Sequence, residues 1–312
     1  MPLTWPEALQ ALLPTAAKRM LDKQRAKFEK DWALVSAAFP IQDKDKDKAK
    51  ARAKGDSGGA PQAECTRDEY LYAWLLVNTR TFYFVTPKTE KLPKEDHMVL
   101  QPVADLFNHT DRHGCHVAFD HAGSFTFTAT RAYEKGEEVH ISYGRHSNDF
   151  LLVEYGFVLA RNEWDEACLD DAVLPALSRR QREEVDDAGF LGNYVLDRDT
   201  VCHRTQVAVR ILAVDSGRRG GGLTMGKWHR FVKGLDDGEG SQAEVDALLV
   251  DLLGDYEDTI KSKVRDLKKW KVGDEDGAED INESRRELLL GRWDQIRKLV
   301  RATIERLEGG DA

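Results

Sequence analysis

Two tyrosines, an Asn-His pair and an arginine carry most of the chemistry that this chain could perform. Tyr143 ends a segment of alternating apolar residues, and Tyr155 follows in the next predicted helix. A phenol hydroxyl is a rigidly held dipole, and its ring tolerates a cationic nitrogen. Arg80 presents a fork of donors that suits a carboxylate. These residue types favour a site that positions a polar or charged ligand.

Each of these residues also has a purely structural interpretation. Tyr143 and Tyr155 could be core aromatics whose hydroxyls bond to the backbone. Asn108 and His109 could form a satisfied buried polar pair. Arg80 could form an ion pair at the end of its helix, because an unpaired buried charge is costly.

Residues 109–116 include four possible metal ligands. They are His109, His113, Cys115 and His116. A structural zinc site usually takes its ligands from two paired clusters, and the sequence shows no second pair. We therefore predict no metal site, and a zinc-dependent hydrolase is a distant alternative.

The elements that would position these residues are short strands and one helix within residues 100–160. Apolar residues alternate over 115–119 and 125–129, which predicts a half-buried hairpin. Residues 138–143 are predicted to form a strand with Val139, Ile141 and Tyr143 on one face. Ser147 is predicted to cap a helix from Asn148 to Tyr155, which Gly156 closes.

In these motifs the chain resembles the C-terminal half of a SET domain, the fold of protein lysine methyltransferases. The matching runs are Pro102 to His109, Gly136 to Val139, Ile141 to Gly144, Ser147-Asn148, Leu151-Leu152 and Tyr155 to Phe157. The branch with this pattern is the one typified by the Rubisco large-subunit methyltransferase, which includes fungal ribosomal-protein lysine methyltransferases. Each motif alone is weak, but their order and spacing together are specific.

The resemblance implies methyl transfer from S-adenosylmethionine to a lysine of a protein substrate. Tyr143 and Tyr155 would be the catalytic pair, and Phe82 and Tyr143 would line the lysine channel. The residues expected to contact the cofactor are Arg80, Asn108, His109, Tyr155 and Phe157. A displacement of this kind needs a neutral amine, which an apolar channel favours by lowering the lysine pKa. Alignment of amine, methyl and sulfur then supplies the rate.

The front of the SET pattern is not recognisable. A SET domain normally opens with strands and a Gly-x-Gly element near the cofactor, but residues 1–39 are predicted to be helical. Thr4 is predicted to cap the first helix, and the second carries an apolar stripe up to Phe39. We therefore expect either an N-terminally shortened enzyme or a degenerate relative. The alternative function is that of a catalytically inactive protein-interaction module.

Residues 1–99 are interpreted as the helical insert of the SET domain, with a disordered loop at 42–62. Thr66 and Glu69 form a predicted capping box, and the apolar run after them predicts a helix buried on every face. Residues 100–160 are then the C-terminal SET half.

Residues 161–312 are predicted to be helical. Ser178 and Gln181 start a short helix, and 205–214 form another. Long apolar stripes from Ser241 and from about Asn282 predict an antiparallel helical hairpin. This part resembles the family's substrate-binding domain. Together with the strands predicted before residue 160, it gives a predicted fold class of α+β, with small SET-type sheets followed by an all-helical domain.

Composition and charge limit the partners. The 312 residues are 41% hydrophobic and 32% charged, with a net charge of −9, which argues against tight nonspecific DNA binding and fits a basic protein substrate. The family resemblance implies that this substrate is ribosomal or nuclear. No apolar run predicts a membrane span, and four widely spaced cysteines indicate reduced thiols. We expect a monomer inside the cell, in the nucleus or cytoplasm.

Overall fold

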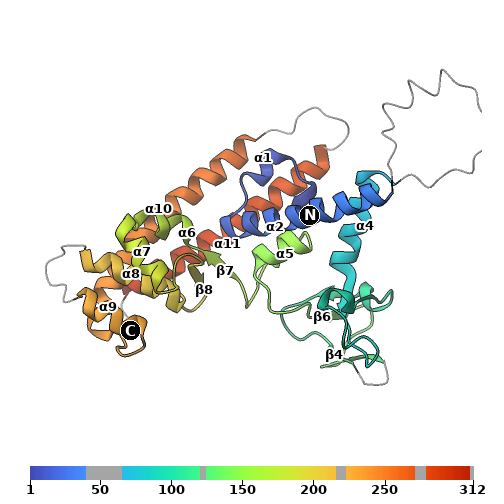
Figure 1. Cartoon of the computed structure of the whole chain (residues 1–312), viewed down its shortest axis with the longest axis horizontal. Coiled ribbons are helices and arrows are strands. Elements are labelled where there is room, and N and C mark those ends of the chain that lie inside the picture. The colour runs from blue at the N-terminus through green and yellow to red at the C-terminus, as the bar shows by residue number, and fades with distance from the viewer. Residues whose placement is uncertain (40–64, 120–123, 216–222, 271–278, 310–312) are drawn as a thin grey trace, which may run out of the picture. The chain divides into compact units, whose positions relative to one another are not determined.

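A computed structural model describes residues 1–39, 65–119, 124–215, 223–270 and 279–309 (Figure 1). The predicted disordered loop at 42–62 lies outside these residues. Contacts divide the chain into two compact units. We call Leu21–Gly144 the sheet unit, and we call Met1–Met20 together with Arg145–Ala312 the helical unit. The domain boundaries at 99/100 and 160/161 stay a prediction.

Among its described residues, the sheet unit contains the greater part of helix α2 and six short strands. Its elements are α2 (Thr15–Ala38, which begins in the helical unit), α4 (Arg67–Arg80), β1 (Thr81–Tyr83), η2 (Lys94–His97), β2 (Met98–Leu100), η3 (Ala104–Leu106), β3 (Asn108–His109), β4 (His116–Phe119), β5 (Phe125–Thr128) and β6 (His140–Ile141). Figure 1 shows α4 leading directly into the strands.

Helices α2 and α4 pack through aromatic side chains. The ring of Phe28 lies edge-on to Trp74, with 5.5 Å between centroids. The Trp74 indole N–H donates to Asp31 at 2.9 Å. At the start of α4, Thr66 and Glu69 form the predicted capping box, which confirms that helix boundary.

The prediction that α4 is buried on every face is wrong. Trp74 is its one buried residue, whereas Tyr72 is 67% exposed and Val77 is 46% exposed. The described contacts of α4 with α2 lie on one side of the helix, where Phe28, Asp31 and Trp74 meet. The apolar run contains tyrosines, and their hydroxyls allow such a helix to face water.

The strands that the structure describes in the sheet unit form three two-stranded sheets. The hairpin β4–β5 is antiparallel, with Val117 opposite Phe127, and confirms the predicted hairpin. Strands β1 and β2 also pair antiparallel, with Phe82 opposite Val99, and were not predicted because three residues are too few to show alternation. The predicted strand 138–143 is shorter in the structure, where only β6 pairs, in parallel, with β3.

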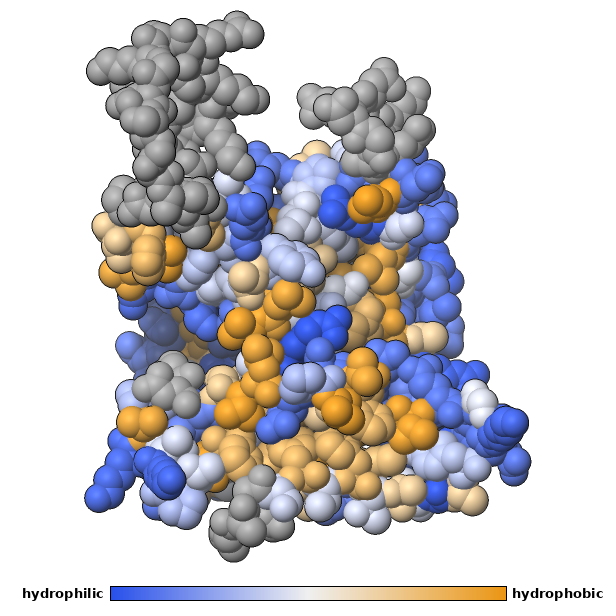
Figure 2. Space-filling model, turned by 90° about the vertical axis from the view of Figure 1, so that its right-hand side faces the viewer, coloured by the Kyte–Doolittle hydropathy of each residue, from blue (hydrophilic) through white to orange (hydrophobic). Residues whose placement is uncertain are grey.

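Six phenylalanines connect the two antiparallel hairpins. We call Phe82, Phe84, Phe107, Phe119, Phe125 and Phe127 the phenylalanine cluster. Phe82 packs edge-on against Phe125, with 5.3 Å between centroids. Phe107 stacks on Phe127 at 4.8 Å. Apolar residues also lie exposed nearby in the chain, and the lower middle of Figure 2 shows a hydrophobic area between hydrophilic margins. The exposed large ones around these strands include Met98, Leu100, Val103, Leu106 and Phe119.

The helical unit is dominated by two long helices. Its elements are η1 (Pro2–Thr4), α1 (Glu7–Gln10), α5 (Asn148–Glu154), β7 (Glu166–Cys168), α6 (Asp170–Ala176), α7 (Arg179–Asp187), β8 (Val195–Asp197), α8 (His203–Asp215), α9 (Met225–Val232), η4 (Glu239–Ser241), α10 (Gln242–Lys269) and α11 (Glu279–Gly309). The pairing of α10 with α11 confirms the predicted helical hairpin (Figure 1).

The core of the helical unit follows the predicted stripes. Buried apolar residues of the two long helices are Val245, Leu249, Leu253, Tyr256, Ile260, Leu267, Leu289, Trp293, Ile296 and Val300. The Ser178–Gln181 capping box of α7 is confirmed. The antiparallel pair β7–β8 lies within residues 161–312, so the prediction of an all-helical domain there is wrong. These results confirm the α+β class, with small sheets and a helical C-terminal region.

Some local predictions fail. The Thr4 hydroxyl donates to the Met1 carbonyl at 3.0 Å, and α1 begins at Glu7 with Pro6 as its N-cap. The predicted Thr4 cap is therefore wrong, since the preceding turn satisfies that hydroxyl. All four cysteines are free, as predicted. In the described part of the chain, every helix is too short or too polar to cross a membrane.

Candidate functional site

The segment that carries Tyr143 is held between two other stretches of the sheet unit. Asn108 pairs with His140 and His109 with Ile141 in the parallel pair β3–β6. The Thr110 N–H donates to the Ile141 carbonyl at 2.9 Å. From the other side, the Cys115 N–H donates to the His140 carbonyl at 2.7 Å. Residues 140–141 are thereby bonded on both sides, which fixes the backbone just before Tyr143.

Tyr143 is anchored at its backbone and at its hydroxyl. Its N–H donates to Nδ1 of His109 at 3.0 Å, and its hydroxyl donates to the Phe107 carbonyl at 2.8 Å. The rings of His109 and Tyr143 lie 5.1 Å apart. His109 is buried, and a neutral ring that accepts at Nδ1 carries its proton on Nε2. The structure therefore brings the predicted residues His109 and Tyr143 into direct contact.

The Tyr143 phenol stays protonated near neutral pH. Burial raises the pKa of Tyr143, and the negative charge of Asp105 raises it further, while Arg80 acts in the opposite direction. Desolvation disfavours the phenolate, and a nearby carboxylate adds to that effect. The hydroxyl is consequently a hydrogen-bond donor across the physiological range.

Arg80 ends α4 and forms an ion pair in the sheet unit. Its Nη1 lies 3.0 Å from Oδ2 of Asp105, and the arginine side chain is half exposed. The structure therefore contains the ion pair that the structural interpretation of Arg80 expected. A guanidinium has five N–H donors, and this contact uses one of them. Arg80 can therefore bind a second carboxylate while it keeps Asp105.

Asn108 and Phe82 have different surroundings. The Asn108 amide donates to Oε1 of Glu138 at 2.6 Å, so its side chain is directed toward the strand segment that precedes Tyr143. Asn108 is exposed, so the interpretation of Asn108 and His109 as a buried polar pair does not hold for Asn108. Phe82 belongs to the phenylalanine cluster, in which Phe125 and Phe127 connect it with Phe107. The Phe107 carbonyl is the acceptor of the Tyr143 hydroxyl.

Tyr155 and Phe157 lie in the helical unit, at the end of α5. The Gly156 N–H donates to the carbonyls of Leu151 and Leu152, and its φ of +85° explains why glycine closes this helix. The Tyr155 ring lies 6.2 Å from the Phe157 ring. Ser147 is the N-cap residue, but its side chain makes no capping bond, so that part of the prediction is wrong. The pairing of Tyr155 with Tyr143 stays a prediction.

Comparison with known proteins identifies the region around Tyr143. A family model described as the SET domain matches residues 15–144. Residues 15–144 are therefore similar to a SET domain. The match includes Arg80, Phe82, Asn108, His109 and Tyr143, whereas Tyr155 and Phe157 follow it.

Curated relatives to which the chain is similar include proteins named as lysine methyltransferases. Ribosomal lysine N-methyltransferase set11 of Schizosaccharomyces pombe is 29% identical over 205 residues, which cover 64% of this chain and 52% of the relative. SET domain-containing protein 4 of Mus musculus is 34% identical over 167 residues, which cover 48% of this chain and 36% of that protein. The chain thus spans about half the length of the first relative.

A solved structure shares the fold. It is the crystal structure of the SET domain of LSMT bound to lysine and AdoHcy, with a TM-score of 0.51 and 16% sequence identity. The likeness covers 98% of this chain and 67% of that one. The helical unit, as well as the SET domain, therefore has a counterpart in a known fold.

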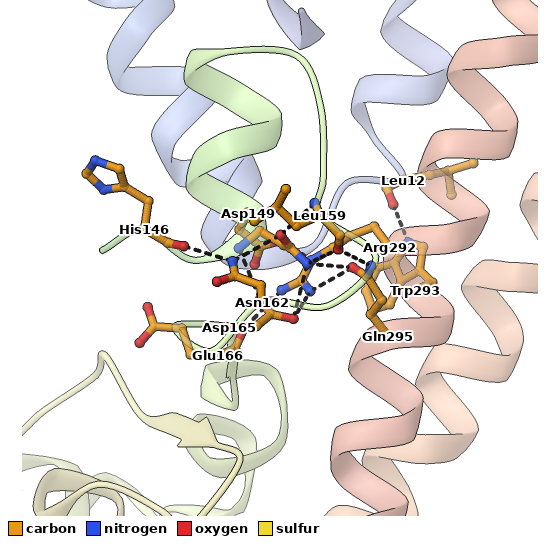
Figure 3. Close-up of polar contacts among 11 residues, drawn as sticks. Leu12, His146, Asp149, Leu159, Asn162, Asp165, Glu166, Arg292, Trp293 and Gln295 are labelled. Atoms are coloured by element: carbon orange, nitrogen blue, oxygen red, sulfur yellow. Dashed lines mark hydrogen bonds and ion pairs between the residues drawn. The ribbon is translucent and has the colours of Figure 1, made fainter. Parts of the chain in front are cut away.

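A buried polar network beyond the SET match holds α5, and the sequence did not predict it. Arg292 of α11 is fully buried and contacts two carboxylates at 2.7 Å, Asp149 through Nε and Asp165 through Nη1 (Figure 3). Burial lowers the pKa of Arg292, but the two carboxylates outweigh it and hold the pKa above its usual value. The Asn148 amide donates to Gln295 and to the Leu159 carbonyl. The network joins the α5 start to α11 across 143 sequence positions.

The only sequence signal for this network was the Ser147-Asn148 motif, which lies next to Asp149. Nothing in the sequence linked Asp149 to an arginine near the C-terminus.

As for metals, the residues that the structure describes contain no group of three or more His, Cys, Asp or Glu side chains placed to hold an ion.

Proposed function

We propose that the chain transfers a methyl group from S-adenosylmethionine to a lysine side chain of a protein substrate. The observation that carries this proposal is the placement of Tyr143 within the SET domain. Its hydroxyl is held on the Phe107 carbonyl, directly before Asn108 and His109. Relatives named as lysine N-methyltransferases support the same reaction.

The residues of the sheet unit fit the cofactor. The methionine part of S-adenosylmethionine has a carboxylate, and Arg80 has donors that its contact with Asp105 does not use. Asn108 and the backbone around His109 offer polar groups beside Tyr143. When bound, the cofactor supplies an electrophilic methyl group on a sulfonium.

The protein's own contribution is alignment and protection of a neutral amine. At pH 7 a free lysine is protonated, and removing its proton costs about 4–5 kcal/mol because its ordinary pKa is ~10.4. An apolar wall lowers that cost by disfavouring the ammonium. Phe82 and its neighbours in the phenylalanine cluster supply apolar surface in the sheet unit.

In this proposal, Tyr143 orients the amine. The protonated phenol and the Phe107 carbonyl place two oxygens 2.8 Å apart, and both can complement a positively charged methyl group. Tyr155 is assigned as its companion in catalysis and cofactor binding, and Phe157 as a further cofactor contact, because both belong to the matched Tyr155 to Phe157 motif.

The substrate that we favour is a basic protein of the ribosome. The net charge of −9 favours approach by a positively charged partner. The relatives from Schizosaccharomyces pombe and Saccharomyces cerevisiae are both named as ribosomal lysine N-methyltransferases. A monomer that acts inside the cell, in the cytoplasm or the nucleus, is consistent with this substrate.

A transfer assay tests the proposal. The chain is incubated with S-adenosylmethionine labelled on its methyl group and with isolated ribosomal proteins, and modified lysines are located by mass spectrometry. Label on lysine that requires the wild-type chain and is lost with Tyr143→Phe supports the enzyme. If calorimetry shows cofactor binding but no basic protein is labelled, the chain is better described as a non-catalytic SET module.

A further inference from the structure

Residues of α10 and α11 line a groove that the proposed methyl transfer does not use. Its volume is about 720 Å³, and both of its walls belong to the helical unit. Asp258, Lys261, Val264, Arg265 and Lys268 come from α10, and Leu290, Asp294 and Arg297 come from α11, so four of the eight lining residues are basic and two are acidic. Basic side chains therefore border this groove on a chain whose net charge is −9.

Two of these cations lack a partner among the described residues. Lys261 contacts Asp258 at 3.0 Å, and Arg297 contacts Asp294 at 2.8 Å. Arg265 and Lys268 are exposed, and neither forms an ion pair or hydrogen bond with any residue that the structure describes. They lie three positions apart on one helix, so they project to the same side. The groove thus has an unneutralised positive edge.

The base of the groove is apolar. Val264 and Leu290 line it, and both are partly exposed despite their aliphatic side chains. Because aliphatic surface gains free energy when it leaves water, these residues favour a ligand with an apolar side chain. The ligand that matches the whole groove combines negative charge with at least one aliphatic group.

We propose that this groove binds an acidic segment of a partner protein, with an aliphatic residue between its carboxylates. From Asp258 to Lys268, α10 covers a length of about 15 Å, which corresponds to about five residues of extended peptide. The carboxylates contact Arg265 and Lys268, and the aliphatic side chain packs on Val264 and Leu290. This site is independent of the proposed methyl transfer.

A nucleic acid fits this groove less well. A phosphate backbone carries one charge about every 1.7 Å of duplex axis and has no aliphatic group for the base of the groove. Asp258 and Asp294 also line the groove and would repel a continuous run of phosphates. A short acidic peptide can place its few carboxylates beside the unpaired cations and avoid these two aspartates.

A binding assay with the whole chain tests the proposal. The probe is a fluorescein-labelled peptide of sequence Glu-Asp-Leu-Glu-Asp, followed by fluorescence anisotropy at low salt. We expect saturable binding that weakens at least about fivefold in the double variant Arg265→Gln with Lys268→Gln. The charge-retaining variant Arg265→Lys with Lys268→Arg should stay within about twofold of wild type. Replacing the peptide's leucine with serine should also weaken binding.

A matched control has the same change in net charge elsewhere on the helical unit. Arg179→Gln with Arg180→Gln removes two exposed cations from α7, and we expect it to leave peptide binding unchanged. Absence of saturable binding, equal losses in both double variants, or an unchanged affinity after the groove substitutions would overturn the proposal. Tighter binding of oligouridylate RNA than of the peptide, with loss in the groove variant, would also overturn it.

Discussion

The Tyr143 hydroxyl donates a hydrogen bond to the Phe107 carbonyl at 2.8 Å, across 36 positions of sequence. This bond fixes the phenol ring, while the bond from the Tyr143 N–H to His109 fixes its backbone. A tyrosine held at both ends has one orientation, which is the property that alignment of a reacting amine requires. The candidate site therefore depends on groups that lie next to two separate strands, β3 and β6, of the sheet unit.

Substitution of Tyr143 by phenylalanine should affect transfer more than stability. Loss of a preorganised dipole at a reacting centre typically costs about 100-fold in rate, whereas a lost neutral hydrogen bond costs about 1 kcal/mol of stability. Methyl-transfer rates and thermal unfolding together check this. The control is Tyr133→Phe, because the Tyr133 hydroxyl also donates to a backbone carbonyl in the sheet unit. Equal effects of the two substitutions on transfer would contradict a catalytic role for Tyr143.

Replacement of His109 by alanine should release the backbone of Tyr143. The Tyr143 N–H would lose the Nδ1 acceptor at 3.0 Å, so we expect faster hydrogen–deuterium exchange in the segment that contains it. His116→Ala, an exposed position on β4, should leave that exchange unchanged. An unaltered exchange rate in His109→Ala would show that the bond to His109 does not hold the segment.

Removal of the Arg80 charge should weaken cofactor binding with little loss of stability. The contact with Asp105 is a half-exposed ion pair and contributes about 0–1 kcal/mol. A bond to the cofactor carboxylate is worth more, so Arg80→Gln should reduce affinity for S-adenosylmethionine by about tenfold or more in calorimetry. Arg67→Gln is the matched control, since Arg67 pairs with Glu29 at the other end of α4. A tenfold loss in the control as well would exclude a specific role for Arg80.

Loss of Arg292 should destabilise the helical unit strongly. Arg292→Met leaves Asp149 and Asp165 without their cation, and breaking a buried pair from one side typically costs about 3–5 kcal/mol. Arg297→Met on the same helix removes a partly exposed pair with Asp294 and should cost less than about 1 kcal/mol. Thermal unfolding of both variants measures the difference. Similar melting temperatures would show that the network around α5 contributes little.

The stability of the helical unit should decline at alkaline pH because of Tyr256. Burial raises the pKa of this α10 tyrosine, so the folded state keeps the phenol proton that the unfolded chain loses above its ordinary pKa of ~10. The stabilisation is therefore complete below about pH 10 and decreases as pH rises further. In thermal melts from pH 9 to 11, Tyr256→Phe should show a shallower decline than wild type. The control Tyr72→Phe, at an exposed position, should decline as steeply as wild type. An identical slope in all three proteins would refute the assignment of this decline to Tyr256.

Predictions from the sequence were most accurate for local structure. The Thr66–Glu69 and Ser178–Gln181 capping boxes depend on residues three positions apart, and both were confirmed. The hairpin β4–β5 and the long helices α10 and α11 were confirmed because their apolar periods extend over enough residues to be recognised. The capping predictions at Thr4 and Ser147 failed where the preceding turn or the side-chain orientation decided the outcome.

The sequence by itself determined the helices, the main hairpin and the motifs of the SET resemblance, since all of these depend on near neighbours or on spacing along the chain. Only the tertiary structure decided which partners Tyr143 and Arg292 have. Phe107 lies 36 positions from Tyr143, and Asp149 lies 143 positions from Arg292. Hydrogen bonds and ion pairs over such separations depend on how the chain folds back on itself, and a pattern of residue types along the sequence does not specify that path.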